Sequence, residues 1–184
     1  LKGEHCLKVA AFTAEEFQGK ADVIFVCVKG YSLDSVVAFI QRVAGPETVV
    51  LPILNIYGTG GKMQEMLPDV DVLDGCTYLY AEIQKPGTIL QSGPYCRIVF
   101  GPRDHNLDDL RYQQIKRDFD ASGIVGELTA HIQRDALQKF SYVSPVGATG
   151  LYYNAVAADM QKDGEARDCF IAMVREISAL ADAM

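Results

Sequence analysis

Two strongly apolar runs, separated by a segment with helical periodicity, constrain the fold of this chain more than any other feature. The first covers residues 21–28 (ADVIFVCV) and the second covers residues 48–54 (TVVLPIL). Continuous runs of Val, Ile and Leu are typical of parallel strands that are covered on both faces. Between the runs, apolar residues recur every three or four positions, as in a helix that packs one face on a sheet: Leu33, Val36, Val37, Ile40 and Val43. The pattern predicts a βαβ unit, and with it an α/β fold built on a mostly parallel sheet.

A polar residue follows each apolar run, Lys29 after the first and Asn55 after the second. Open α/β sheets bind ligands in the crevice outside the carboxyl ends of their strands. We therefore predict that Lys29 lies at a ligand site, because few structural roles explain a lysine at the end of a buried strand. Asn55 fits two roles equally well, that of a strand-end cap and that of a group that hydrogen-bonds a ligand. The glycine-rich segment 58–61 resembles an anion-binding loop only weakly and fits a flexible turn at least as well.

Shorter strand and helix signals continue to about residue 130. Alternating polarity predicts antiparallel edge strands with one wet face, over residues 71–83, 88–91 and 96–101. An amphipathic helix is predicted over residues 107–121 and a last short strand over 124–129. Near the start, residues 8–12 predict a short strand, and Thr13 and Glu16 have the spacing of a capping box before a short helix.

From about Ile132 the pattern is helical, with breaks predicted at the Pro- and Gly-containing segments 145–150 and 162–164. We expect a domain boundary near residue 130, so that residues 1–130 form an α/β part and residues 131–184 the first part of an all-helical domain. The helix predicted over residues 164–183 is apolar along one side. We expect further chain or a second subunit to cover that side.

Charge and cysteine content narrow the function classes. The formal net charge of -7, without a basic stripe, argues against nucleic acid as a partner and favours a small molecule. The five cysteines show no C-x-x-C motif and no zinc-type pairing with histidine. They predict reduced, mostly buried thiols in a cytoplasmic protein without a metal site. No apolar stretch approaches the roughly 18 residues that predict a membrane span.

Lys139 lies in the helical segment, close along the chain to the expected domain boundary. At a cleft between the domains, its ammonium group would donate a proton to a developing alkoxide and stabilise its charge. The alternative is a solvated helix lysine, which the sequence by itself favours. Ser144 and Thr149 supply hydroxyl groups that would suit a small polar ligand.

The order of these features resembles the ketopantoate reductase (2-dehydropantoate 2-reductase) family. Six stretches between about residues 20 and 155 carry the resemblance: 21–29 (ADVIFVCVK), 48–55 (TVVLPILN), 74–78 (DGCTY), 86–87 (PG), 97–101 (RIVFG) and the helix with Lys139 and Phe140. The resemblance implies that residues 1–130 belong to a Rossmann-type NADPH-binding domain, incomplete at its N-terminus, and that residues 131–184 begin a helical substrate and dimerisation domain. It implies the NADPH-dependent reduction of 2-dehydropantoate, or of a related branched 2-oxoacid, to the 2-hydroxy acid in pantothenate biosynthesis.

The resemblance also implies roles for individual residues. By position, Lys139 is similar to the family's catalytic lysine, which protonates the carbonyl oxygen as hydride arrives. Lys29 and Asn55 match positions on the cofactor side of the cleft, and Asn55 and Ser144 match positions on the substrate side. The family pattern further implies a cytoplasmic enzyme that can form a homodimer, a glycine-rich phosphate loop before Leu1, and more helices after Met184.

Three positions depart from the family pattern. Ile56 stands where the family has a glycine that lets the backbone approach the cofactor. Val143 and Gly147 stand where the family has asparagines that hydrogen-bond the substrate. These departures leave a second hypothesis open, a catalytically impaired nucleotide- or metabolite-binding module on the same fold.

Overall fold

The computed structural model describes residues 3–183, which divide into two compact units. The α/β unit contains the chain up to Leu54 together with Gly58–Ile132. The helical unit contains Asn55–Tyr57 and the chain from Gln133 onward. Three residues of the connection between a strand and a helix of the first unit therefore belong to the second.

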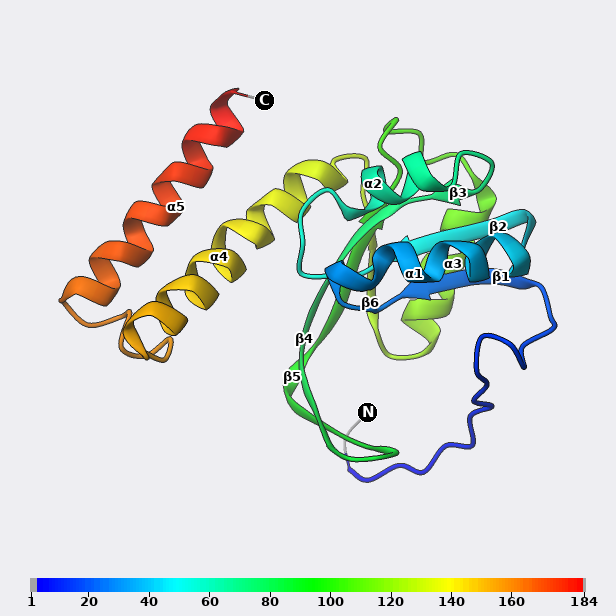
Figure 1. The fold of residues 1–184 in the computed structure, drawn as a ribbon, viewed down its shortest axis with the longest axis horizontal. Helices are drawn as coiled ribbons and strands as arrows, with labels where there is room; N and C mark the ends of the chain where they lie inside the picture. Colours follow the sequence, from blue (N-terminus) through cyan, green and yellow to red (C-terminus); the bar gives the residue numbers. More distant parts are fainter. Residues whose placement is uncertain (1–2, 184) are drawn as a thin grey trace. The chain divides into compact units, whose positions relative to one another are not determined.

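A parallel sheet opens the α/β unit, in the order β1-β2-β3 (Figure 1). Its strands are β1 (Ala21–Val26), β2 (Ala44–Pro52) and β3 (Asp71–Val72). The 3-10 turn η1 (Gly30–Ser32) and helix α1 (Leu33–Val43) connect β1 to β2, and α2 (Thr59–Met66) precedes β3. The predicted βαβ unit is confirmed, and Val26 and Pro52 are register partners at the carboxyl ends of β1 and β2.

A mixed sheet of β4 (Asp74–Lys85), β5 (Thr88–Gly101) and β6 (Val125–Leu128) follows, with α3 (Leu110–Ala121) between its last two strands. Strands β4 and β5 are antiparallel, as predicted, whereas β6 runs parallel to β5. The backbone of Leu73, between β3 and β4, donates a hydrogen bond to Val50 and so continues the pairing with β2. Figure 1 shows that β4 and β5 extend together as a long ribbon beyond the other strands.

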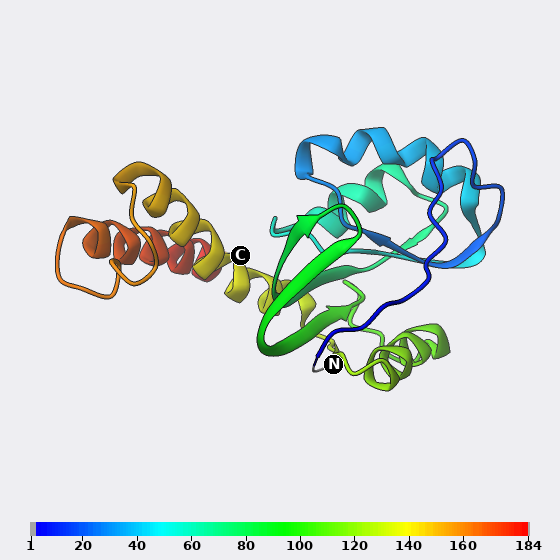
Figure 2. The same ribbon diagram turned by 90° about the horizontal axis from the view of Figure 1, so that it is seen from below.

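Helices cover both faces of the sheet, with α1 and α2 on one face and α3 on the other (Figure 2). Val49 and Leu51 of β2 pack in the core that contains α3, whereas Val50 packs in the core formed with α1 and α2. All three side chains are at most 1% exposed. Because successive side chains of a strand point to opposite faces, covering both faces requires the continuous apolar run seen in the sequence.

The helical unit contains α4 (Ile132–Tyr153) and α5 (Glu165–Ala183). The break predicted near residues 145–150 is wrong, because α4 continues through Pro145. A proline in a helix removes one backbone hydrogen bond, but packing on both sides of Pro145 holds α4 together. The rings of Tyr142 and Phe170 meet edge to face with centroids 6.2 Å apart, and the buried Thr149 contacts the sulfur atoms of Cys169 and Met173.

Two further predictions are wrong near the N-terminus. Residues 8–12 form no strand, and Val9 is 80% exposed, so this short apolar run has no packing partner to hold it extended in a sheet. The capping-box hydrogen bonds do form: Thr13 N donates to Glu16 Oε2 at 2.8 Å, and Glu16 N donates to Thr13 Oγ1 at 3.4 Å. They close a single turn rather than a helix, since one turn gains few hydrogen bonds for the backbone freedom it loses.

The expectation of mostly buried thiols is also wrong. All five cysteines are free, but only Cys76 is buried, while Cys96 and Cys169 are half-buried and Cys6 and Cys27 are exposed. Cys27 comes directly after the last residue of β1, where the covered part of the strand has ended. Within residues 3–183, no helix has the length and apolar character needed to cross a membrane.

Candidate active site

Lys139 and Asn55 meet in the helical unit. Lys139 Nζ donates a hydrogen bond of 2.7 Å to Asn55 Oδ1. Asn55 comes three residues after the end of β2, and Lys139 lies at the start of the third turn of α4. A side-chain amide oxygen is a neutral acceptor, so it orients the ammonium group without cancelling its positive charge.

An aromatic contact joins the same two segments of the chain, the one that contains Asn55 and the one that contains Lys139. Tyr57, two residues after Asn55, packs on Phe140, which follows Lys139, with ring centroids 6.3 Å apart and planes tilted by 42°. Ile56, between Asn55 and Tyr57, is 50% exposed. The segment Asn55–Tyr57 therefore contacts α4 through a polar pair and an aromatic pair. Sequence reasoning missed the aromatic pair, because Tyr57 and Phe140 are distant in the chain and no sequence pattern connects them.

The other two predicted site residues, Lys29 and Ser144, belong to different elements of the chain. Lys29, in the α/β unit, is exposed and precedes η1, where its backbone carbonyl accepts a 2.8 Å hydrogen bond from Ser32 N. Ser144 is half-buried in α4, five residues after Lys139. Five residues correspond to about 140° around a helix, so Ser144 does not share the face of Lys139.

Because α4 is uninterrupted, two further residues, Val143 and Gly147, lie on the side of the helix that carries Lys139, which we call the Lys139 face. Val143 and Gly147 follow Lys139 by four and eight residues, a spacing that keeps side chains on one side of a helix. Val143 is half-buried, and a Cβ atom added to Gly147 would meet nothing within 4 Å. This side of α4 therefore carries an ammonium group, an apolar side chain and open space.

The glycine-rich start of α2 is occupied by a carboxylate of the chain itself. Gly60 N donates a buried hydrogen bond of 2.8 Å to Asp74 Oδ1, and Asp74 is only 8% exposed. The other oxygen, Asp74 Oδ2, forms an ion pair of 3.3 Å with Arg103, which also bonds Gln64 of α2. A helix N-terminus attracts anions, and here Asp74 already supplies one.

Sequence reasoning missed this cluster, although it considered segment 58–61 as an anion-binding loop. A signal was present: Asp74 lies between two apolar strand segments, immediately before Gly75. A carboxylate at such a position is buried only when it is paired and hydrogen-bonded. Its partner could not be found from the sequence, because 14 residues separate Gly60 from Asp74.

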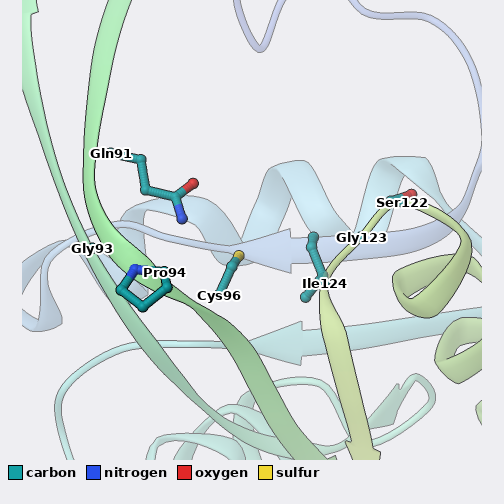
Figure 3. Close-up of a pocket in the computed structure, with 7 residues that line it drawn as sticks. All are labelled: Gln91, Gly93, Pro94, Cys96, Ser122, Gly123 and Ile124. Carbon is teal, nitrogen blue, oxygen red and sulfur yellow. The ribbon is translucent and has the colours of Figure 1, made fainter. Parts of the chain in front are cut away.

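A separate pocket of about 360 Å³ lies in the α/β unit, between β5 and the turn that follows α3 (Figure 3). It is lined by Gln91, Gly93, Pro94, Cys96, Ser122, Gly123 and Ile124. None of the predicted site residues is among them. The pocket forms where β5 bulges, because Leu79 pairs with Cys96 while the next residue, Tyr80, pairs with Ser92.

Comparison of the sequence with known protein families shows to which family the chain belongs. The model of the family described as ketopantoate reductase PanE/ApbA matches residues 1–105, which is more than half of the chain. The chain belongs to the ketopantoate reductase family. Membership accounts for the parallel sheet with helices on both faces, and the fold is the Rossmann-type α/β fold that the sequence predicts.

Two relatives in sequence are named as oxidoreductases. The 2-dehydropantoate 2-reductase of Nostoc sp. (strain PCC 7120) is 24% identical over 169 residues, which cover 90% of this chain and 53% of that protein. The uncharacterized oxidoreductase YkpB of Bacillus subtilis (strain 168) is 26% identical over 137 residues, which cover 73% of this chain and 44% of that protein. The chain spans about half the length of these relatives.

A solved structure of a family member has a similar fold. The crystal structure of 2-dehydropantoate 2-reductase from Porphyromonas gingivalis W83 matches with a TM-score of 0.79 and 25% sequence identity. The match covers 91% of this chain and 56% of that protein. Both units of the chain are therefore parts of an oxidoreductase-family architecture.

Proposed function

We propose that the protein of which this chain is part reduces a branched 2-oxoacid to the 2-hydroxy acid, with NADPH as the reductant. The observation that carries the proposal is the 2.7 Å hydrogen bond from Lys139 Nζ to Asn55 Oδ1. It gives the Lys139 ammonium group a hydrogen-bonding partner, Asn55, which follows a strand end of the kind where open α/β sheets bind ligands. Such a partner orients the ammonium group, as a general acid requires.

Lys139 supplies the proton of this reaction. Reduction adds a hydride to the ketone carbon and leaves negative charge on the carbonyl oxygen. Lys139 Nζ holds the proton that this oxygen receives, and its positive charge stabilises the oxygen before the transfer is complete. Asn55 orients the ammonium group, and solvent returns a proton to Lys139 after product leaves.

The carboxyl ends of β1 and β2 suit a nicotinamide dinucleotide. These strands are parallel and in register at Val26 and Pro52, and Lys29 and Asn55 each follow by three residues. We propose that Lys29 and Asn55 contact the cofactor, which when bound supplies the hydride. Because Asp74 already accepts from Gly60 N at the start of α2, the cofactor's phosphates are not held there.

The Lys139 face of α4 indicates the substrate class. Val143 offers an apolar contact and Gly147 leaves space, so neither side chain can hydrogen-bond a hydroxyl group on the substrate. We propose that Asn55 contacts the polar end of the substrate and that a branched apolar group faces Val143. The substrate contact predicted for Ser144 is not part of this arrangement, because Ser144 lies on another side of α4. The best substrate is then a branched 2-oxoacid that lacks the terminal hydroxyl of 2-dehydropantoate.

The test is NADPH oxidation by the full-length protein, followed by absorbance, with a panel of 2-oxoacids. We expect 3-methyl-2-oxobutanoate to give a higher kcat/KM than 2-dehydropantoate, and NADPH a higher value than NADH. No turnover with any branched 2-oxoacid would overturn the proposal. Preference for the hydroxylated substrate would refute the role given to Val143 and Gly147.

A second candidate is a binding module that keeps the fold without catalysis. It is favoured by Ile56, half exposed beside Asn55, where a bulky side chain limits how closely a cofactor can approach the backbone. This candidate predicts micromolar or tighter NADPH binding by calorimetry without turnover. Substituting Ile56→Gly would then strengthen binding and still give no product.

The two units receive separate roles in this proposal. Residues 1–130 supply part of the NADPH-binding domain, and residues 131–184 supply the first part of a helical domain for substrate binding and dimerisation. A homodimer in the cytoplasm is the setting that this assignment favours, and preference for 2-dehydropantoate in the substrate panel would instead favour a role in pantothenate biosynthesis. Light scattering of the full-length protein tests the dimer.

A further inference from the structure

Asn55 lies in a short segment that is anchored at both ends. Before it, Ile53 N donates a hydrogen bond of 3.1 Å to the carbonyl of Val26. After it, α2 begins, and Gly60 N donates to Asp74 Oδ1 at 2.8 Å. Only a few residues separate these two anchors, so each of them limits where Asn55 can be.

The anchor at Gly60 leaves almost no freedom of movement. A Cβ atom on Gly60 would lie 2.3 Å from both Asp74 Oδ1 and the carbonyl oxygen of Leu73. Leu73 is itself fixed, since its N–H donates to Val50 at 2.9 Å. The backbone of the first turn of α2 therefore packs directly on the backbone of Leu73 and the side chain of Asp74, because Gly60 has no side chain to separate them.

The Asp74 carboxylate is itself held from the other side. Arg103 pairs with Asp74 Oδ2 at 3.3 Å and reaches Gln64 Oε1 at 3.3 Å. Gln64 in turn donates 2.8 Å hydrogen bonds to the carbonyls of Leu67 and Val70. The start and the end of α2 are thus both connected to one partly buried ion pair.

We infer that Asp74 is a positioning residue that fixes Asn55, and through it the ammonium group of Lys139. The inference rests on the proposed reductase function for its kinetic consequence. Without the carboxylate, the Gly60 amide has no buried acceptor and the start of α2 moves away from the sheet. Asn55 then loses one of its two anchors, and the hydrogen bond that orients Lys139 is formed for less of the time.

The test compares Asp74 with a second carboxylate of the same unit. Asp71 pairs with Arg111 at 2.8 Å and accepts a 2.8 Å hydrogen bond from Tyr112, but it contacts no residue of α2 in these interactions. Asp74→Ala, Asp74→Asn and the control Asp71→Asn are made in the full-length protein. Amide hydrogen exchange over residues 53–63 is measured together with kcat and KM.

We expect Asp74→Ala to accelerate exchange over residues 53–63 and to lower kcat about 10- to 100-fold, with KM for NADPH changed less than about threefold. Asp74→Asn keeps an oxygen for the Gly60 amide and loses the charge that pairs with Arg103, so its kcat should lie between those of Asp74→Ala and wild type. Asp71→Asn should lower the melting temperature and leave both local exchange and kcat as in wild type.

Two results would overturn the inference. One is unchanged exchange over residues 53–63 in Asp74→Ala. The other is a loss of kcat in Asp71→Asn equal to that in Asp74→Ala, which would show a general effect of stability. If the wild type reduces no 2-oxoacid, the proposed function fails, and the exchange difference between the Asp74 and Asp71 variants alone decides whether Asp74 positions this segment.

Discussion

Lys139 Nζ donates a hydrogen bond of 2.7 Å to Asn55 Oδ1, although 84 residues separate the two in the chain. The pair joins a helix to the connection that follows a parallel strand. If Lys139 is the proton donor, Lys139→Ala should lower kcat about 100- to 10,000-fold and change KM for NADPH little. Steady-state kinetics of the full-length protein measure this.

Asn55→Ala should lower kcat less than Lys139→Ala does. It removes the hydrogen bond that orients the Lys139 ammonium group, but the proton donor itself remains. In the Lys139→Ala background, Asn55→Ala should lower kcat almost no further, since residues that act as a unit are not additive. The KM values should still rise, because the contacts of Asn55 with cofactor and substrate are lost. Lys162→Ala is the control: Lys162 pairs with Asp159 on the surface of the same unit, with its side chain 73% exposed. Full activity of Lys139→Ala would refute the role of Lys139.

Gly60 and Gly61 are neighbours in α2, and we expect their substitution by alanine to change the stability of the protein in opposite directions. A Cβ at Gly60 would collide with Asp74 and the Leu73 carbonyl, whereas one at Gly61 would meet nothing within 4 Å. Gly60→Ala should lower the free energy of unfolding by about 1–3 kcal/mol through overpacking. Gly61→Ala should raise it by up to about 1 kcal/mol through helix propensity. Urea denaturation measures both, and equal effects would contradict the close packing at Gly60.

Asp109 caps α3 and should make stability depend on pH in the acid range. Its carboxylate accepts from Arg111 N at 2.8 Å and pairs with the Arg111 guanidinium, whose side-chain hydrogen bonds lower the pKa of Asp109. A pKa that is lower in the folded state adds stability above the unfolded value of about 3.9. That stability is lost as the pH falls through the folded pKa.

Asp109→Ala should therefore cost about 1 kcal/mol near pH 7, and its difference from wild type should shrink below about pH 4. Urea denaturation at a series of pH values measures the difference. The neighbouring Asp108→Ala is the control, because Asp108 is exposed. A difference that stays constant down to about pH 3 would count against the ion pair as its source.

Thr149 tests the packing of α4 on α5. It is fully buried, and its hydroxyl group lies 3.9 Å from Cys169 Sγ and 3.8 Å from Met173 Sδ, which are weak acceptors. Thr149→Val keeps the shape and should leave stability unchanged or raise it by up to about 1 kcal/mol. Thr149→Ala leaves a void and should lower it by about 1 kcal/mol. Greater destabilisation by Val than by Ala would contradict this packing.

The strands of the first sheet could be predicted because local and tertiary signals agree. Residues 48–54 are apolar throughout since both faces of β2 are covered, and no other arrangement of a short run explains that composition as simply. Residues 8–12 show the limit of the same reasoning. Their apolar character is real, but a strand also needs a neighbour, and a sequence pattern does not show whether one exists.

The continuity of α4 and the contact of Asp74 with α2 could not be predicted from the sequence, because both depend on contacts between residues that are distant in the chain. Pro145 ordinarily interrupts a helix, but α4 continues through it, with contacts to α5 at Tyr142 and at Thr149 on either side. Asp74 meets Gly60 across the α2 connection, so its role depends on the folded path of the chain. The resemblance to the family singled out Lys139 and Asn55, whereas their hydrogen bond required the structure.

The continuity of α4 gives Lys139 a mechanical connection to a distant part of the helical unit. Fourteen residues separate Lys139 from Tyr153 at the end of the helix, a length of about 21 Å along its axis. Leu151 and Tyr152, near that end, are 88% and 82% exposed. Because α4 is continuous from Lys139 to Leu151 and Tyr152, we expect a partner that tilts this end of the helix to change the direction of the Lys139 ammonium group as well.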